Sequence, residues 1–245
     1  MYATLIVVAA LWGAAAGLFV PRAAYRLSVE PEEPWRERCP DGHPLVGPGR
    51  GWLGAPGRRA CATTTSPLLA PLLTAAACAV LAAATGGPRP ELVVWWLCAP
   101  FAVLLACVDV RVHRLPDGVT LPLAAAVPLL LGGAALLPYG AGSWTHALLG
   151  GLVLGGAYGV LALINPGGLG LGDVKLALPL GAALGWYGWG VLFLGAFAGF
   201  LLGAVYGFGL VLLRRADRSS AIPFGPFMLT GGLLGLALGA FTAVP

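Results

Sequence analysis

The chain has 245 residues, of which 58% are hydrophobic and 10% are charged, and its formal net charge is +4 at pH 7. A soluble domain carries about 25% charged residues, so this composition excludes an ordinary soluble protein and indicates a polytopic membrane protein. We therefore expect the protein to lie in a lipid bilayer. The basic residues are interpreted as a topology signal, because they are not interleaved with aromatic residues as in nucleic-acid-binding proteins. No nucleic-acid partner is expected.

Apolar segments divide the chain into potential membrane spans. About 20 apolar residues are needed to cross the hydrocarbon core as a helix, and we predict an all-α fold with about eight transmembrane helices. The predicted spans are residues 3–20, 67–85, 92–109, 118–137, 145–164, 174–187, 189–213 and 222–243. The sixth is short, so a seven-span alternative, in which GWYGWG is a kink and not a turn, stays open.

The N-terminal part of the chain differs in composition from the rest. MYATLIVVAALWGAAAGLFV has no basic region ahead of its apolar core, so we expect a retained first span and no cleaved signal peptide. Residues 21–66 are rich in Pro, Gly and Arg and have little periodicity, which predicts an irregular or partly disordered loop. We therefore divide the chain into residues 1–66, a first span with its loop, and residues 67–245, a transmembrane domain.

The basic residues predict the orientation of the spans. With eight spans, all of the 14 Lys and Arg residues except Arg89 fall on one side of the membrane. Loops rich in Lys and Arg stay cytoplasmic, so we expect this side to be cytoplasmic and both termini to lie outside. Seven spans would move Arg214, Arg215 and Arg218 to the outside, so the charges favour eight.

Three aspartates lie at the cytoplasmic ends of predicted spans: Asp109, Asp117 and Asp173. A charged residue at the centre of a span costs at least about 2.5 to 3.5 kcal/mol, so acids at these places need an explanation. Two carboxyl groups brought close together cannot both ionise easily. The ionised one can then activate water while the protonated one polarises a scissile carbonyl. The topology permits Asp109 and Asp173 to form such a pair, whereas Glu91 is expected to be a solvated loop charge.

Each of these residues also has a structural interpretation. A single Asp at the end of a span is more often a cap or an interface residue than a catalyst. Asp117 follows Pro116, which is typical of a turn or a helix cap. Lys175 is expected to reach the interface or to pair with a nearby acid. His113 is expected to be structural or solvated.

Four separated strings resemble the prepilin peptidases, a family of membrane aspartyl proteases. DVRVHRLPDGVTLP at 109–122 is similar to the first motif of the family, and GLGDVKLALPLGAALGW at 170–186 is similar to its Gly-x-Gly-Asp motif. IPFGPFM at 222–228 is similar to the entry of the final span, and GLFVPRAAYRL at 17–27 is similar to the segment after the first. The strings occur in the family's order along the whole chain.

The resemblance implies an aspartic endopeptidase of the inner (cytoplasmic) membrane whose catalytic residues are Asp109 and Asp173. Residues 67–245 would then form a transmembrane aspartyl peptidase domain. Its substrates would be type IV prepilin-like precursors, which carry a short basic leader, a Gly and a hydrophobic helix and are cleaved on the cytoplasmic side. Four further positions are expected to bind substrate or support the site: Gly170, Gly172, Lys175 and Asp117. Of these, Asp117 matches a position that the family does not require for cleavage.

The cysteines depart from the family pattern. Many bacterial members carry two Cys-x-x-Cys pairs that hold zinc, and these members also N-methylate the trimmed product with S-adenosylmethionine. Here RCPDGHPL contains only Cys39 and GRRACATTT contains only Cys61, so the loop holds a degenerate cysteine motif. A structural zinc site needs four ligands, and these two cysteines with His43 supply three at most. We therefore expect no metal, no cofactor and no N-methylation.

Two other classes of function stay open. A non-catalytic relative of these enzymes could serve as a membrane assembly factor, but the presence of aspartate at both catalytic positions favours an enzyme. An ion-coupled transporter is the other alternative, because intramembrane acids often mark ion paths. The acids of this chain lie at one face of the membrane, and no inverted repeat of broken helices is apparent, which argues against a transporter.

Overall fold

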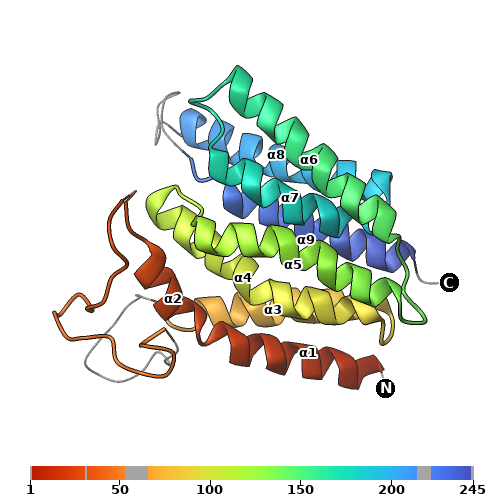
Figure 1. Ribbon diagram of the computed structural model, residues 1–245, viewed down its shortest axis with the longest axis horizontal. Coiled ribbons are helices and arrows are strands. Elements are labelled where there is room, and N and C mark those ends of the chain that lie inside the picture. The colour runs from red at the N-terminus through yellow and green to blue at the C-terminus, as the bar shows by residue number, and fades with distance from the viewer. Residues whose placement is uncertain (1, 31, 53–65, 214–221, 244–245) are drawn as a thin grey trace.

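The computed structural model describes residues 2–30, 32–52, 66–213 and 222–243. Within these residues the regular structure is helical, and the only β-type pairing is an isolated bridge between Arg38 and Pro44 (Figure 1). The predicted all-α fold is confirmed. The helices are α1 (Tyr2–Gly17), α2 (Val20–Leu27), α3 (Leu69–Thr85), α4 (Pro90–Val112), α5 (Asp117–Ala135), α6 (Trp144–Ile164), α7 (Leu171–Gly185), α8 (Trp189–Leu212) and α9 (Gly225–Thr242).

The helices have the length and composition of a multi-pass membrane protein. In the described part of the chain, six segments are long and apolar enough to cross a membrane, with α1 and α2 counted as one. The apolar helix α3 has 17 residues, and α7 has 15 residues with Asp173 in its first turn. Every predicted span corresponds to one of these helices. Because α7 ends at Gly185 and α8 begins at Trp189, GWYGWG contains a turn, as the eight-span prediction requires.

The prediction of an irregular loop over residues 21–66 is wrong at its start. Residues 20–27 form α2, whose apolar residues recur at helical spacing and therefore share one face. An eight-residue helix is too short to stand out beside the apolar spans in the sequence. The buried residues of this face are Val20, Ala24 and Leu27, which belong to one apolar cluster with Leu104 and Val108 of α4.

Glycines allow three helix pairs to pack at backbone contact: α1 with α3, α6 with α7, and α8 with α9. A Cβ atom at one glycine of each pair would lie 2.6 Å from a backbone oxygen of the facing helix, a distance that real side chains do not show. Small residues serve the same purpose in other helix interfaces in lipid. The three glycines and the residues whose oxygens face them are Gly13 and Thr74, Gly150 and Gly181, and Gly231 and Gly195.

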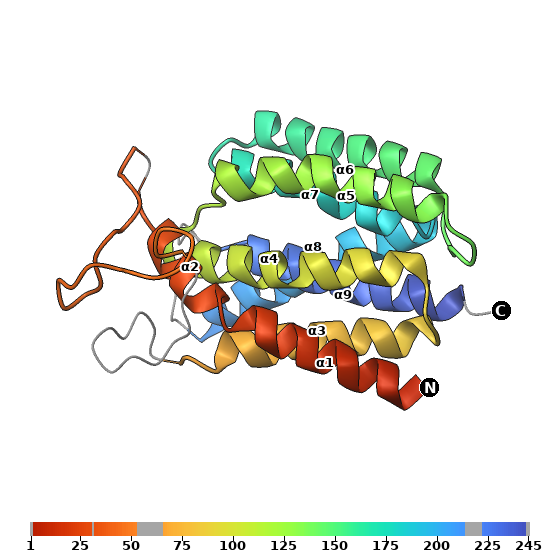
Figure 2. The ribbon, with the colours of Figure 1, turned by 60° about the horizontal axis from the view of Figure 1, so that its bottom comes forward.

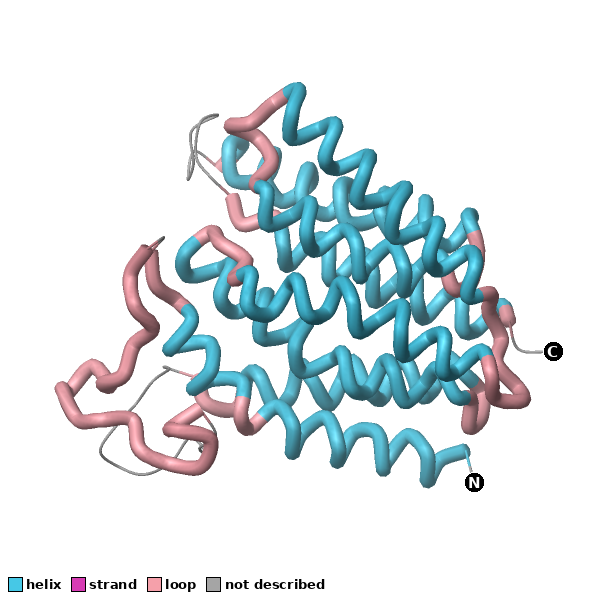
Figure 3. The backbone as a smooth tube through the Cα atoms, in the orientation of Figure 1, coloured by secondary structure: helices cyan, strands magenta, loops and turns pink. Residues whose placement is uncertain are grey.

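The helices form two groups that meet along the bundle. In Figure 2, α5, α6 and α7 lie above α4, while α1 and α3 lie below it. Helix α9 contacts α3, α4 and α7 and therefore connects the two groups. The connecting segments gather at the two ends of the bundle (Figure 3). The start of α1 and the end of α9 share one end, and α2, the α4–α5 turn and the α6–α7 loop lie at the other (Figure 1).

Glu91 is not the solvated loop charge that the sequence suggests. It lies in the first turn of α4 and its side chain is fully buried. The backbone N–H of Ala141 donates a hydrogen bond to its Oε1 at 3.3 Å. An acid in the first turn of a helix interacts favourably with the helix dipole, which partly offsets its burial.

Candidate active site

Asp109 lies in the last turn of α4, at the end of the bundle opposite the termini. The helix stops at Val112 because His113 adopts a left-handed conformation, with φ of 49°, and donates its N–H to the Asp109 carbonyl at 2.8 Å. The Asp109 side chain is buried, and its Oδ2 accepts a hydrogen bond of 2.8 Å from the N–H of Gly225. Gly225 is the first residue of α9, so the carboxylate lies where that helix favours negative charge.

Asp173 lies in the first turn of α7. Its Oδ2 accepts a hydrogen bond of 3.2 Å from the N–H of Gly170, the N-cap residue, in the manner of one half of a capping box. A Cβ atom on Gly172 would lie 3.1 Å from Cβ of Leu115, so glycine lets the start of α7 lie against the α4–α5 turn. Gly170 and Gly172 thus support the position of Asp173 in different ways.

The structure brings Asp109 and Asp173 to one cleft of about 480 Å³. Together with burial, the negative charge of Asp109 disfavours the ionised form of the Asp173 carboxyl group. Each carboxylate is held through one oxygen by a backbone N–H at a helix N-terminus. Because helix N-termini stabilise negative charge, these two hydrogen bonds help to explain why an apolar chain tolerates two acids here.

Asp117 does not cap α5. Pro116 is the N-cap residue, and no side chain bonds to the free N–H groups there. The Asp117 carboxylate instead accepts a hydrogen bond from Lys175 Nζ at 2.7 Å, so of the two expectations for Lys175 the pairing with an acid is the one observed. The side chains are 56% and 31% exposed. Solvent therefore screens the pair, and such exposed ion pairs contribute about 0 to 1 kcal/mol.

Three polar residues that the sequence did not indicate also line the cleft: Glu30, His113 and Arg114. His113 stands four residues after Asp109 in the same short motif, and this closeness along the chain could have drawn attention to it. Glu30 comes from the chain after α2, and nothing in its neighbourhood points to the cleft. Its position depends on the docking of α2 against α4, which the sequence did not reveal.

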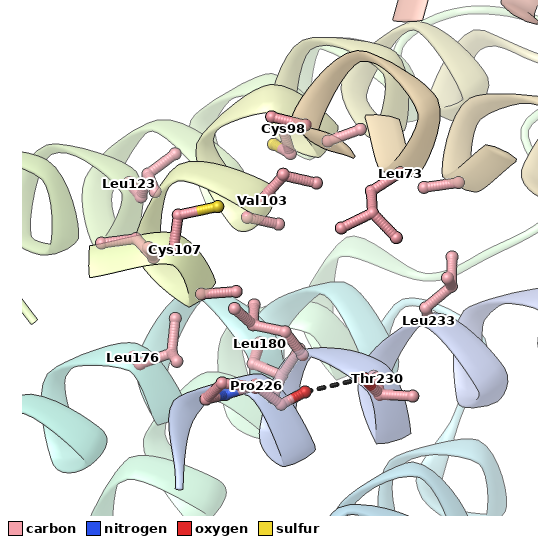
Figure 4. A pocket seen from close by; sticks show the side chains of 18 of the residues that line it. Leu73, Cys98, Val103, Cys107, Leu123, Leu176, Leu180, Pro226, Thr230 and Leu233 are labelled. Carbon is pink, nitrogen blue, oxygen red and sulfur yellow. Dashed lines mark hydrogen bonds between the residues drawn. The ribbon is translucent and has the colours of Figure 1, made fainter. Parts of the chain in front are cut away.

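A second, larger cavity of about 640 Å³ runs between α3 and α4 on one side and α7 and α9 on the other (Figure 4). We call it the apolar groove, since nearly all of its lining side chains are apolar. Cys107, Leu176 and Pro226 belong to its lining and stand within three residues of Asp109, Asp173 and Gly225 along the chain. The apolar groove therefore extends to the elements that carry the aspartates.

Among the residues that the structure describes, neither aspartate belongs to a group that could hold a metal ion. Within the described residues, one such group is found, and it consists of Cys39, Asp41 and His43 in the segment after α2. Asp41 did not figure in the prediction that no metal is bound. Cys61, which did, lies outside the described residues.

Comparison with known proteins gives one consistent result. Residues 96–212, which include both aspartates, match the model of the type IV leader peptidase family. The chain is 35% identical to a protein of Aeromonas salmonicida over 219 residues, which cover 83% of this chain and 72% of the relative. It is 36% identical to a protein of Aeromonas hydrophila with the same coverage. A protein of Burkholderia pseudomallei is 31% identical over 239 residues, 89% of this chain and 70% of its own.

All three relatives are named prepilin leader peptidase/N-methyltransferase. No solved structure matches the chain. Because the similarity extends over most of this chain and more than two thirds of each relative, the chain belongs to the type IV leader peptidase family.

Proposed function

We propose that this protein is a membrane aspartyl endopeptidase that removes the basic leader of type IV prepilin-like precursors, with Asp109 and Asp173 as its catalytic pair. The observation that carries the proposal is that two carboxyl groups from different helices share one cleft and interact electrostatically. The names of the relatives support the choice of substrate. Residues 67–245 are proposed as the peptidase domain, since they contain both aspartates.

The proposed chemistry follows from two carboxyl groups at close range. Repulsion between like charges keeps one of them protonated and the other ionised. The ionised group takes a proton from a water molecule, whose oxygen attacks the scissile carbonyl carbon, while the protonated group donates a hydrogen bond to the carbonyl oxygen. When the tetrahedral intermediate collapses, the C–N bond breaks and the leaving amine takes up a proton. The cleft releases two peptides, and the pair returns to one proton.

The surroundings of the pair suit the two parts of such a precursor. The cleft is lined by four acids, Glu30, Asp109, Asp117 and Asp173. With one of the aspartate pair protonated, their three negative charges still outnumber the two permanent cations, Arg114 and Lys175, which favours a basic leader. A substrate segment within the bilayer has to be helical, because its backbone groups find no water there. We propose that this apolar helix lies in the apolar groove with its cytoplasmic end at the aspartates.

The proposal is tested by co-expressing a prepilin with this protein or with an empty vector. Mass spectrometry of the pilin N-terminus reads the position of cleavage and the presence of a methyl group in one measurement. We expect cleavage directly after the Gly that ends the leader and, because the cysteine pairs are incomplete, no methylation. An unprocessed prepilin beside accumulated enzyme would contradict the proposed function.

Filling the apolar groove should slow cleavage. Thr230 of α9 lines the groove and bonds to the Pro226 carbonyl through Oγ1 at 2.7 Å (Figure 4). In Thr230→Phe the aromatic ring would occupy space proposed for the substrate helix. Since even one methylene group in an apolar pocket changes rates by about 10- to 200-fold, we expect the initial cleavage rate in membranes to fall at least about tenfold.

Thr242→Phe is the matched control for this variant. Thr242 lies on the same helix and makes the same type of bond, to the Leu238 carbonyl at 3.0 Å, but it does not line the groove. Equal cleavage rates in the two variants would show that the substrate does not lie against this part of α9.

We further propose that the aspartate end faces the cytoplasm and that both termini lie outside, in the inner membrane. In a cysteine-free background, Tyr139→Cys should react with a membrane-impermeant maleimide in intact cells, because Tyr139 is exposed in the α5–α6 loop at the end of the termini. Arg50→Cys, at the other end, should react only after the cells are opened. The reverse pattern would invert the proposed topology.

A further inference from the structure

A tight hairpin follows α2 and bears three potential metal ligands. Arg38 and Pro44 form an antiparallel bridge, and the N–H of Cys39 donates to the His43 carbonyl at 2.9 Å. The N–H of Gly42 donates to the Cys39 carbonyl at 2.9 Å, and Gly42 has a φ of 83°, which glycine adopts easily. These bonds bring the side chains of the two arms together at the tip.

The sulfur and nitrogen donor atoms at the tip have nearly the separation that they have in a zinc site. Sγ of Cys39 lies 3.8 Å from Nδ1 of His43, and one donor atom each from Cys39, Asp41 and His43 lies within 4.8 Å of the others. Bonds of about 2.3 Å to sulfur and 2.0 to 2.1 Å to nitrogen, arranged tetrahedrally, give a sulfur–nitrogen separation of about 3.6 Å. The observed separation is within a few tenths of an ångström of that value.

We propose that Cys39, Asp41 and His43 form a binding site for a divalent cation of the zinc type. Thiolate, imidazole and carboxylate are the three ligand types that zinc accepts in proteins. Cys39 is buried while Asp41 and His43 are exposed, so water can complete the coordination of an ion held by these three residues. This proposal departs from the sequence prediction of no metal, because that prediction counted the missing cysteines and left out Asp41.

A bound ion would link the two arms of the hairpin and would thereby stabilise the parts of the molecule that the arms contact. Cys39 and His43 stand on opposite arms, so one ion joins both. Side chains of α2 donate hydrogen bonds to both arms, from Tyr25 Oη to the Arg38 carbonyl at 3.2 Å and from Arg22 to the Val46 carbonyl at 2.8 Å. Through α2, the ion would stabilise the segment that covers the end of α4.

Metal content tests the proposal without reference to peptidase activity. The full chain is purified with a tag that contains no histidine, loaded with Zn²⁺, dialysed and analysed for zinc. We expect about one zinc per chain. His43→Ala and Asp41→Asn should each bind zinc at least about 10- to 100-fold more weakly, since even the loss of a residue that merely orients a ligand costs that much. Both residues are exposed, so these variants should fold.

Controls of the same residue types lie elsewhere in the chain. His146→Ala and Cys98→Ser should retain the zinc of the unsubstituted protein. With Co²⁺ in place of Zn²⁺, a thiolate-to-metal absorption band should appear in the unsubstituted protein and in Cys98→Ser, and should be absent from Cys39→Ser. A protein without zinc after loading, or one that keeps its zinc in both His43→Ala and Asp41→Asn, would overturn the proposal.

Discussion

Asp109→Asn and Asp173→Asn are each expected to abolish cleavage of a prepilin while the protein still inserts into the membrane and accumulates. Asparagine preserves the shape of the side chain and can still accept the backbone N–H from Gly225 or Gly170. It cannot take a proton from water, and it leaves the pair with one carboxyl group where the proposed chemistry requires two. The measurement is the fraction of processed pilin in membranes that contain equal amounts of each variant.

Two further variants sharpen this test. Asp117→Asn should keep much of the activity, since it removes only a solvent-screened ion pair with Lys175, worth about 0 to 1 kcal/mol. The double variant of Asp109 and Asp173 should be no less active than either single one, because residues that act as a unit are not additive. Substantial cleavage by Asp173→Asn, above that in membranes without the protein, would refute the mechanism. Loss of cleavage in Asp117→Asn alone would show that the pair had been assigned wrongly.

Gly225→Ala is expected to cause the second-largest loss of activity. A Cβ atom at this position would lie 2.8 Å from Oδ2 and 3.2 Å from Cγ of Asp109, so the carboxylate or the start of α9 has to move. Misplacement of a reacting group by about 1 Å can cost about 100-fold in rate, and we expect a loss of that order in kcat. The loss should persist at saturating substrate, because the displaced group acts on the reaction and not on binding.

Gly156→Ala provides the comparison for this substitution. Gly156 lies in α6, and nothing stands within 4 Å of a Cβ atom built there. Alanine is favoured over glycine in a helix interior by roughly 1 kcal/mol, so this variant should accumulate well and retain full activity. Full activity in Gly225→Ala would mean that the bond from α9 does not position Asp109.

The sequence predicts most of the membrane-spanning fold because its signals are local. A run of apolar residues long enough to cross a bilayer is visible without knowledge of its neighbours, and each predicted span corresponds to a helix. Local signals do not reveal α2, whose eight residues form a helix that is buried because α4 supplies the facing surface. It also misplaces Glu91, whose burial depends on the chain around Ala141, far along the sequence.

The sequence predicts the acids of the candidate site but not the contacts that these acids make. Asp109 and Asp173 stand out because a charge beside an apolar run is costly. The partner of Asp117 is 58 residues away, so the sequence suggested a local cap where the structure has an ion pair. The bond from Gly225 to Asp109 spans 116 residues and joins α9 to α4. Such contacts arise from the packing of whole helices, which no short motif encodes.

The start of α1 and the end of α9 lie at the end of the bundle opposite the aspartates (Figure 1). The two ends are separated by about the 30 Å of a hydrocarbon core, so a fusion at either terminus stands clear of the cleft. If the protein is immobilised through a terminal tag, the aspartates therefore face the solution on the other side of the membrane from the tag. In reconstituted vesicles, a molecule whose tag faces outward has its cleft in the lumen. A protease added outside trims only these tags. The trimmed fraction therefore gives the fraction of molecules that an external substrate cannot reach.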